Sequence, residues 1–235
     1  STGQACQSIE RIYVPASRHD VFLEKLVEAA KAVRLNHPYI EEGEIGPLIF
    51  EKQADIIAAQ IEDARSKGAR VLTGGEIETH GGGKWLRPTV ICDVDHSMTV
   101  MTEETFGPTV AINSVRDLDE AVDRANASGY GLAASIFGRT IPRVEAAARR
   151  LRVGMVSINS WVMYAGVPSL PWGGVGESGI GRIHGADGLR AFTQPRSVVR
   201  QRFALPIALT SFERPAWAGK VVLAALRARH GGWRG

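Results

Sequence analysis

Residues 8–35, SIERIYVPASRHDVFLEKLVEAAKAVRL, decide the fold because they join a strand pattern directly to a helix pattern. The first part alternates apolar and polar side chains and contains isoleucine and valine, which is typical of a β-strand that ends at Pro15. The second part repeats apolar residues at the spacing of one helix face, namely Val21, Phe22, Leu26, Val27, Ala30 and Val33. A strand followed at once by an amphipathic helix predicts one half of a β-α-β unit.

The same two patterns alternate along most of the chain. Further strand patterns cover residues 69–75, 85–94, 105–115, 131–138 and 153–161, and helix patterns cover 51–68, 117–128 and 141–152. Residues 75–85, GEIETHGGGKW, are rich in glycine and are predicted to form a surface turn. Helices of about 10–15 residues between short strands are typical of a largely parallel sheet with flanking helices, so the predicted fold class is α/β.

The composition is that of an ordinary globular protein. Of 235 residues, 44% are hydrophobic, and the net charge is only +3. The small excess of arginine and lysine lies mainly near the C-terminus, so the sequence lacks the broad basic surface that nucleic-acid binding requires. The six histidines are scattered, which predicts no metal site, and no apolar run approaches the roughly 20 residues that span a bilayer.

Two cysteines, Cys6 and Cys92, lie far apart in the sequence. With no secretory signal in the sequence, we expect free thiols, a reducing compartment and a cytoplasmic location. Cys92 belongs to an apolar strand pattern and is predicted to be structural. Residues 174–179, GVGESG, have the spacing G-x-G-x-x-G, but the flanking strand and helix are missing, and Gln194 stands where an acidic residue is needed. A turn is therefore predicted there rather than a phosphate-binding loop.

Five segments together resemble the NAD(P)-dependent aldehyde dehydrogenase superfamily. They are TGQACQSIERIYV (2–14), MTEETFGPTVAI (101–112), ANASGYGLAASIF (125–137), GMVSINS (154–160) and PWGGVGESGIGRIHGADGLRAFTQPRSV (171–198). These segments follow the order and the separations that the superfamily has, from Gly3 to about Arg200. The resemblance covers only the C-terminal, catalytic half of such enzymes. Their nucleotide-binding domain, the asparagine of their oxyanion hole and the glutamate of their Glu-Leu-Gly-Gly motif lie upstream of the matching part.

The resemblance also implies a domain organisation. Residues 1–190 are expected to form an aldehyde dehydrogenase catalytic domain that is incomplete at its N-terminus. Residues 191–202 contain the final strand pattern, RSVVRQ (196–201), which in the family pairs with a neighbouring subunit. The intact enzyme is therefore expected to be a homodimer or homotetramer. Residues 203–235 depart from the family pattern and are predicted to form a basic helix that covers its own subunit, with contact to an anionic membrane surface as the alternative.

By this resemblance Cys6 is the catalytic nucleophile. In the family, the cysteine thiolate attacks the aldehyde to give a thiohemiacetal, hydride passes to the nicotinamide, and water hydrolyses the remaining thioester to the carboxylic acid. A free cysteine has a pKa of about 8.5, so it needs activation, which the family obtains from water held by the upstream glutamate. The alternative for Cys6 is simple burial, which is common for free cysteines.

Three residues match cofactor-binding positions of the family. Glu104 corresponds to the glutamate that binds the ribose hydroxyls of the nicotinamide nucleoside, and Phe106 to the aromatic residue beside the nicotinamide. Gln53 falls near a position that reaches the cofactor ribose. The alternatives are a solvated carboxylate for Glu104, core packing for Phe106 and an ordinary helix surface for Gln53. Whether the cofactor is NAD or NADP depends on the part upstream.

Four further residues are expected near the aldehyde. Trp172 matches an aromatic residue of the substrate pocket, Trp161 and Tyr164 precede it in the same loop, and Asn159 matches an asparagine near the catalytic loop, with a turn-forming role as its alternative. An aromatic wall would favour apolar or aromatic aldehydes over small charged ones. Arg11 is expected in a surface salt bridge, although it could instead attract a carboxylate-bearing substrate.

Three functions stay open on the sequence. The first is the catalytic half of an aldehyde dehydrogenase, which by itself makes little or no NADH because the cofactor domain is missing. The second is a catalytically silent fragment that serves folding or oligomerisation. The third is a CoA-acylating relative, which differs in what attacks the thioester.

Overall fold

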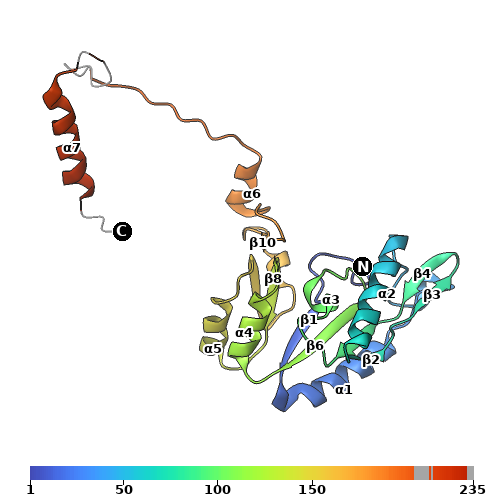
Figure 1. Cartoon of the computed structure of the whole chain (residues 1–235). Coiled ribbons are helices and arrows are strands. Elements are labelled where there is room, and N and C mark those ends of the chain that lie inside the picture. Colours follow the sequence, from blue (N-terminus) through green and yellow to red (C-terminus); the bar gives the residue numbers. More distant parts are fainter. Residues whose placement is uncertain (204–211, 213, 232–235) are drawn as a thin grey trace. The chain divides into compact units, whose positions relative to one another are not determined.

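The computed structural model describes residues 1–203, 212 and 214–231. The chain divides into two compact units, Ser1–Thr193 and Gln194–Gly235. The first unit contains all the strands of the described residues (Figure 1).

The main sheet of the first unit has four strands in the order β1-β6-β5-β2. They are β1 (Arg11–Pro15), β6 (Thr109–Val115), β5 (Thr89–Cys92) and β2 (Arg70–Thr73). β1 pairs in parallel with β6, and β6 in parallel with β5, whereas β2 is antiparallel to β5. The α/β class with a largely parallel sheet is therefore confirmed.

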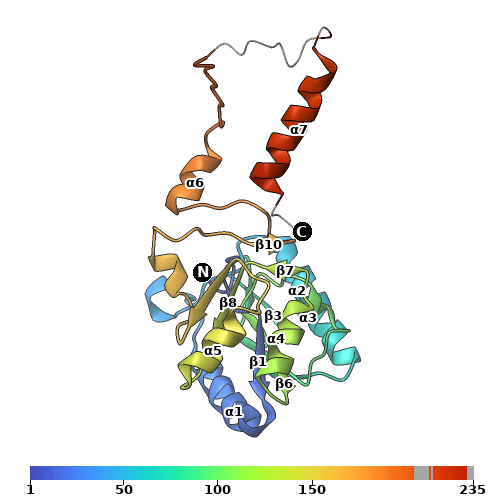
Figure 2. The same ribbon diagram turned by 90° about the vertical axis from the view of Figure 1, so that its left-hand side faces the viewer.

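Two helices cover opposite faces of this sheet because side chains alternate along the strands. α1 (Ala16–Ala32) packs Leu23 and Ala30 against Val90, Cys92 and Ile112. α2 (Glu51–Ser66) packs Ile57 and Ile61 on the other set of strand residues, Ile91 and Ala111. The ribbons of α1 and α2 can be followed in Figure 2. Burying an isoleucine or leucine side chain contributes about 1.5–3 kcal/mol, so these two layers form the main core.

The chain then continues into a smaller parallel pair. α4 (Leu118–Asn126) follows β6, and the Asp117 side chain caps it by accepting a hydrogen bond from the Glu120 N–H at 2.9 Å. β8 (Ala133–Ile136) and β9 (Met155–Ile158) pair in parallel and are linked through α5 (Ile141–Ala148). The shorter elements are η1 (Ile40–Glu42), α3 (Thr99–Thr102), β7 (Tyr130–Gly131), η2 (Met163–Gly166), β10 (Val175–Gly176) and α6 (Gly185–Ala191).

The glycine-rich segment 75–85 differs from its prediction as a surface turn. It forms most of an antiparallel hairpin of β3 (Ile77–His80) and β4 (Gly83–Leu86), and Trp85 and Leu86 are buried. Gly81 and Gly82 have positive φ angles of 56° and 82°, which a two-residue hairpin turn requires. Residues 174–179 form the short strand β10 and a tight turn, and the turn prediction is confirmed.

The second unit contains one helix among its described residues, α7 (Ala216–His230). α7 lies within residues 203–235, of which residues 204–211, 213 and 232–235 lie outside the described residues, and the predicted organisation of this tail stays a prediction. Residues 196–201 are exposed and form no strand in this single chain, because no neighbouring strand pairs with them. Their pairing with another subunit stays a prediction. No helix among the residues that the structure describes is long and apolar enough to cross a membrane.

Candidate active site

The segment around Cys6 is held by side-chain bonds to a neighbouring loop. The Gln4 side chain donates to the Pro47 carbonyl at 3.1 Å and accepts from the Ile49 N–H at 2.8 Å. The Thr2 hydroxyl accepts from the Gly46 N–H at 3.0 Å. A surface turn with few apolar contacts therefore has a fixed position through polar bonds.

The two cysteines occupy opposite environments. Cys6 is exposed, whereas Cys92 on β5 is fully buried. Burial, reinforced by the Asp93 carboxylate, raises the pKa of the Cys92 thiol to about 11. The alternative of a buried Cys6 is wrong in this structure, and the structural interpretation of Cys92 agrees with its burial. Cys6 is thus the thiol that a reactant can reach.

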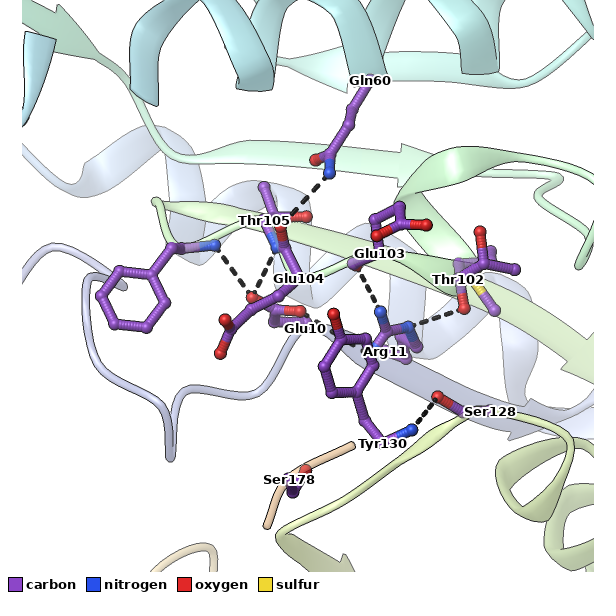
Figure 3. A network of polar contacts seen from close by, with 12 residues as sticks. Glu10, Arg11, Gln60, Thr102, Glu103, Glu104, Thr105, Ser128, Tyr130 and Ser178 are labelled. Atoms are coloured by element: carbon purple, nitrogen blue, oxygen red, sulfur yellow. Dashed lines mark hydrogen bonds and ion pairs between the residues drawn. The ribbon is translucent and has the colours of Figure 1, made fainter. Parts of the chain in front are cut away.

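Glu104 lies in a turn that connects α3 with β6, and its side chain is exposed (Figure 3). Partial burial of the carboxyl, followed by repulsion from the Glu10 carboxylate, raises the pKa of Glu104, and attraction by Arg11 opposes this shift. Phe106 is half-buried and has a positive φ of 52°. A left-handed backbone at a bulky residue is uncommon and needs support from its surroundings.

That support comes from both sides of the turn. On the α2 side, Gln60 donates to the Glu104 carbonyl at 3.3 Å and Gln53 donates to the Thr105 carbonyl at 2.6 Å. On the β1 side, the Thr105 and Phe106 N–H groups both donate to one Glu10 carboxylate oxygen at 2.9 Å. The Gln53 amide N–H thus acts on the turn, and a contact between Gln53 and the cofactor stays a prediction.

Arg11 forms an ion pair, as expected, with Glu10 at 3.7 Å, but the pair is largely buried rather than on the surface. Its guanidinium donates to the Met101 carbonyl at 2.8 Å and to the Glu103 carbonyl, and its side chain is only 15% exposed. It also lies 5.8 Å from the centre of the Tyr130 ring (Figure 3). The sequence pattern missed the roles of Glu10, Arg11 and Gln60 because charged and amide residues beside a strand or on a helix face usually point to solvent.

Tyr164 lines a cavity and lies within electrostatic range of Cys6. Its side chain is buried, and its pKa is raised by burial and then by its electrostatic interaction with Cys6. The cavity measures about 410 Å³. Its lining extends along the chain from the start of β9 through η2 to α6: Gly154, Met155, Val156, Tyr164, Leu170, Pro171, Arg182 and Asp187. It therefore combines an apolar wall with one cationic and one anionic side chain.

The other predicted pocket residues take different places. Trp172 is half-buried and exchanges two backbone hydrogen bonds of 2.7 Å with Ile183, while Trp161 is 58% exposed. The Asn159 amide bonds both backbone groups of Gly138, at 2.8 and 2.9 Å, and Asn159 itself has a φ of 55°. These contacts favour the turn-forming alternative for Asn159. No cluster of metal-ligating side chains occurs among the described residues.

Comparison with known proteins gives consistent matches. The model of the Aldehyde dehydrogenase family matches residues 1–198. A Mycobacterium ulcerans protein, named as a succinate-semialdehyde dehydrogenase (NADP(+)) 2, is 40% identical over 203 residues, which is 86% of this chain and 39% of that protein.

Solved structures agree. The structure of a protein from Anabaena variabilis named as an aldehyde dehydrogenase, PutA, has 45% sequence identity and a TM-score of 0.78, and the match covers 81% of this chain and 41% of that one. A betaine aldehyde dehydrogenase from Staphylococcus aureus in complex with NAD+ has 34% identity and a TM-score of 0.76, with 81% and 38% covered. The chain thus spans about 40% of the length of these relatives.

Proposed function

Because the chain belongs to the aldehyde dehydrogenase family, we propose that it is the catalytic half of an NAD(P)-dependent enzyme that oxidises an aldehyde to a carboxylic acid. Cys6 is its nucleophile. The observation that carries the proposal is the exposed Cys6 thiol, which lies on a polar-bonded turn and interacts with Tyr164 of the cavity wall.

Cys6 would begin the reaction by attack of its thiolate on the aldehyde carbon. The carbonyl double bond opens, the sulfur–carbon bond forms, and the oxygen becomes an oxyanion. The Cys6 backbone N–H donates to no backbone carbonyl among the described residues. It can therefore donate to this oxyanion, as one member of an oxyanion hole. The thioester that follows the oxidation is later hydrolysed and returns the thiol.

The residues of the Glu104 turn fit a nicotinamide cofactor. The Glu104 carboxylate is exposed and offers two acceptor oxygens for a pair of ribose hydroxyls, and the backbone that carries it is bonded on both sides. Phe106 adds an aromatic side chain two residues away. When bound, the nicotinamide supplies the hydride acceptor. Names of relatives mention both NADP(+) and NAD+, so the choice between NAD and NADP stays open.

The cavity supports two classes of aldehyde. Met155, Val156 and Tyr164 give the apolar wall that suits hydrophobic or aromatic aldehydes. Arg182 lines the same cavity and would attract an aldehyde with a carboxylate, which agrees with the name of the Mycobacterium ulcerans relative. Catalytic efficiencies for hexanal, benzaldehyde and succinate semialdehyde separate these candidates.

The proposal assigns this chain only part of the machinery. The cofactor domain and the residues that complete activation of the thiol belong to the portion of the relatives that this chain does not span. The chain alone would therefore make little or no NADH. We further propose that residues 196–201 pair with a second subunit, giving a homodimer or homotetramer. A silent fragment and a CoA-acylating enzyme stay as alternatives.

The test is NADH or NADPH formation from an aldehyde panel by the full-length protein, compared with its Cys6→Ser variant. Turnover by the wild type and none by the variant would support the proposal. Equal turnover of both would remove Cys6 from the mechanism. If neither variant turns over while both are folded, the silent alternative is favoured, and acyl-CoA formation in the presence of CoA identifies the acylating one.

A further inference from the structure

Two consecutive side chains at the start of β1, those of Glu10 and Arg11, hold the backbone of residues 101–106 through hydrogen bonds. Arg11 donates hydrogen bonds to the carbonyls of Met101 and Glu103 at one end of this turn. Glu10 accepts hydrogen bonds from the N–H groups of Thr105 and Phe106 at the other end (Figure 3). Glu104 lies in the sequence between the residues bonded by Arg11 and those bonded by Glu10.

The position of Glu10 is energetically unfavourable for an ionised carboxylate, because its side chain is largely buried. Its side chain is only 11% exposed, and the nearest charge, on Arg11, is 3.7 Å away. Two N–H donors at 2.9 Å replace much of the hydration that burial removes. The reverse also holds, since without Glu10 the two N–H groups would lose their acceptor. The carboxylate and the turn therefore depend on each other.

Several backbone polar groups of the turn already have side-chain partners. The carbonyls of Glu104 and Thr105 are taken by Gln60 and Gln53, and the amides of Thr105 and Phe106 by Glu10. The Glu104 side chain is exposed on this bonded backbone, as is that of Glu103. The backbone that carries Glu104 is thus held by contacts that do not involve its own side chain.

Glu10 also shares a short stretch of chain with the candidate nucleophile. Only three residues separate it from Cys6. A side chain that bonds the Glu104 turn from this position ties the turn to the Cys6 segment. A distance between the thiol and the cofactor-binding carboxylate is thereby fixed, as hydride chemistry between two bound reactants requires.

We propose that Glu10 is a positioning residue, which acts through the Thr105 and Phe106 amides to hold Glu104 and Phe106 in the cofactor-binding arrangement relative to Cys6. The inference rests on the proposed function of Glu104. Arg11 supports it by holding the other end of the same turn. Glu10 itself contacts neither substrate nor cofactor in this role.

The experiment is a double-mutant cycle on cofactor affinity in the full-length protein. NAD+ and NADP+ are titrated separately, by calorimetry, into the wild type, Glu10→Ala, Glu104→Gln and the double variant. Glu10→Ala is expected to weaken binding about tenfold or more, and to add little on the Glu104→Gln background, because both act on one contact. Independent, additive effects would overturn the inference. Glu28→Ala, at an exposed position of α1, is the matched control and should bind as the wild type does.

Two further readouts separate positioning from general damage. Hydrogen exchange at the amides of Thr105 and Phe106 should accelerate in Glu10→Ala, while the rate of Cys6 alkylation stays unchanged. Glu10→Gln keeps an acceptor oxygen and should restore affinity to within about threefold of the wild type. If the alanine variant does not fold, Glu10→Met takes its place, since methionine has a side chain of similar length without an acceptor oxygen, and it is expected to weaken binding as Glu10→Ala would.

The outcomes distinguish a failure of the proposed function from a failure of the positioning role of Glu10. A wild type that binds neither NAD+ nor NADP+ would contradict the proposed function. A wild type that binds the cofactor while Glu10→Ala binds it equally well, or exchanges its Thr105 and Phe106 amides no faster, would contradict the role of Glu10 alone.

Discussion

A Cβ atom placed on Gly3 would lie 2.1 Å from the carbonyl oxygen of Gly107. Gly3 precedes Cys6 on one turn, and Gly107 follows the Glu104 turn, so the two halves of the candidate site meet backbone to backbone. Gly3 also has a φ of +70°, a conformation that favours glycine. Two independent reasons therefore exclude a side chain at this position.

The first prediction concerns this contact. Gly3→Ala should destabilise the protein by about 2–5 kcal/mol, the sum of left-handed strain and overpacking, and should displace the Cys6 turn. Gly68→Ala is the control, since Gly68 has a φ of +95° but no atom within 4 Å of the added Cβ. Urea denaturation should show that Gly68→Ala lowers the free energy of unfolding by only about 1–2 kcal/mol. Equal losses for the two variants would mean that the Gly107 contact contributes nothing.

The second prediction concerns thiol accessibility. Iodoacetamide should label Cys6 in the folded protein and leave Cys92 unlabelled, because Cys92 is fully buried and has a pKa of about 11. Mass spectrometry of tryptic peptides locates the label. Cys6→Ser should abolish the labelling and Cys92→Ser should leave it intact. Rapid labelling of Cys92 under native conditions would contradict the burial of β5.

The third prediction concerns the pH dependence of cofactor affinity. In the proposed function, the ionised form of Glu104 accepts hydrogen bonds from the ribose hydroxyls, and the pKa of Glu104 is raised above the usual 4.5 by burial and by Glu10. Affinity should therefore fall as the pH is lowered, beginning at a higher pH than for an ordinary glutamate. Glu10→Gln removes the negative neighbour and should shift this fall to lower pH. Glu104→Gln should remove the fall, and an unchanged profile in that variant would exclude Glu104 as the titrating group.

The fourth prediction concerns stability in acid. The backbone N–H and the guanidinium of Arg116, with Arg124, lower the pKa of Glu120 from 4.5 to about 2. A lowered carboxyl pKa contributes stability above pH 4.5, and this contribution is lost as the pH falls towards 2. Glu120→Gln should therefore unfold at lower urea concentration than the wild type at pH 7, and the difference should shrink at pH 3.

Glu145→Gln, on the exposed surface of α5, is the control for the Glu120 variant and should change the urea midpoint little at either pH. A Glu120 effect of the same size at pH 3 and pH 7 would assign it to packing rather than to charge.

The sequence predicted the framework better than the site. Strand and helix periods located β1, α1, α2 and β6 because each of these elements buries a regular face. The glycine-rich pattern of residues 75–85 indicates a loop and gives no sign of the β3–β4 hairpin, although two of these glycines form its turn. Short motifs indicated Cys6 and Glu104. The bonds of Glu10 and Arg11 to the turn join residues 90 or more positions apart, and no local pattern contains them.

The bond between Glu10 and Thr105 spans 95 residues of chain, which sets the time at which the site can exist. During synthesis at about 5–20 residues per second, the Cys6 segment emerges roughly 5–20 s before the turn that completes it. Until β6 docks beside β1, Glu10 cannot bond the Glu104 turn to the Cys6 segment. Loop closure over this distance is among the slower steps of folding. The Cys6 segment and the Glu104 turn are therefore brought together only when the sheet is complete.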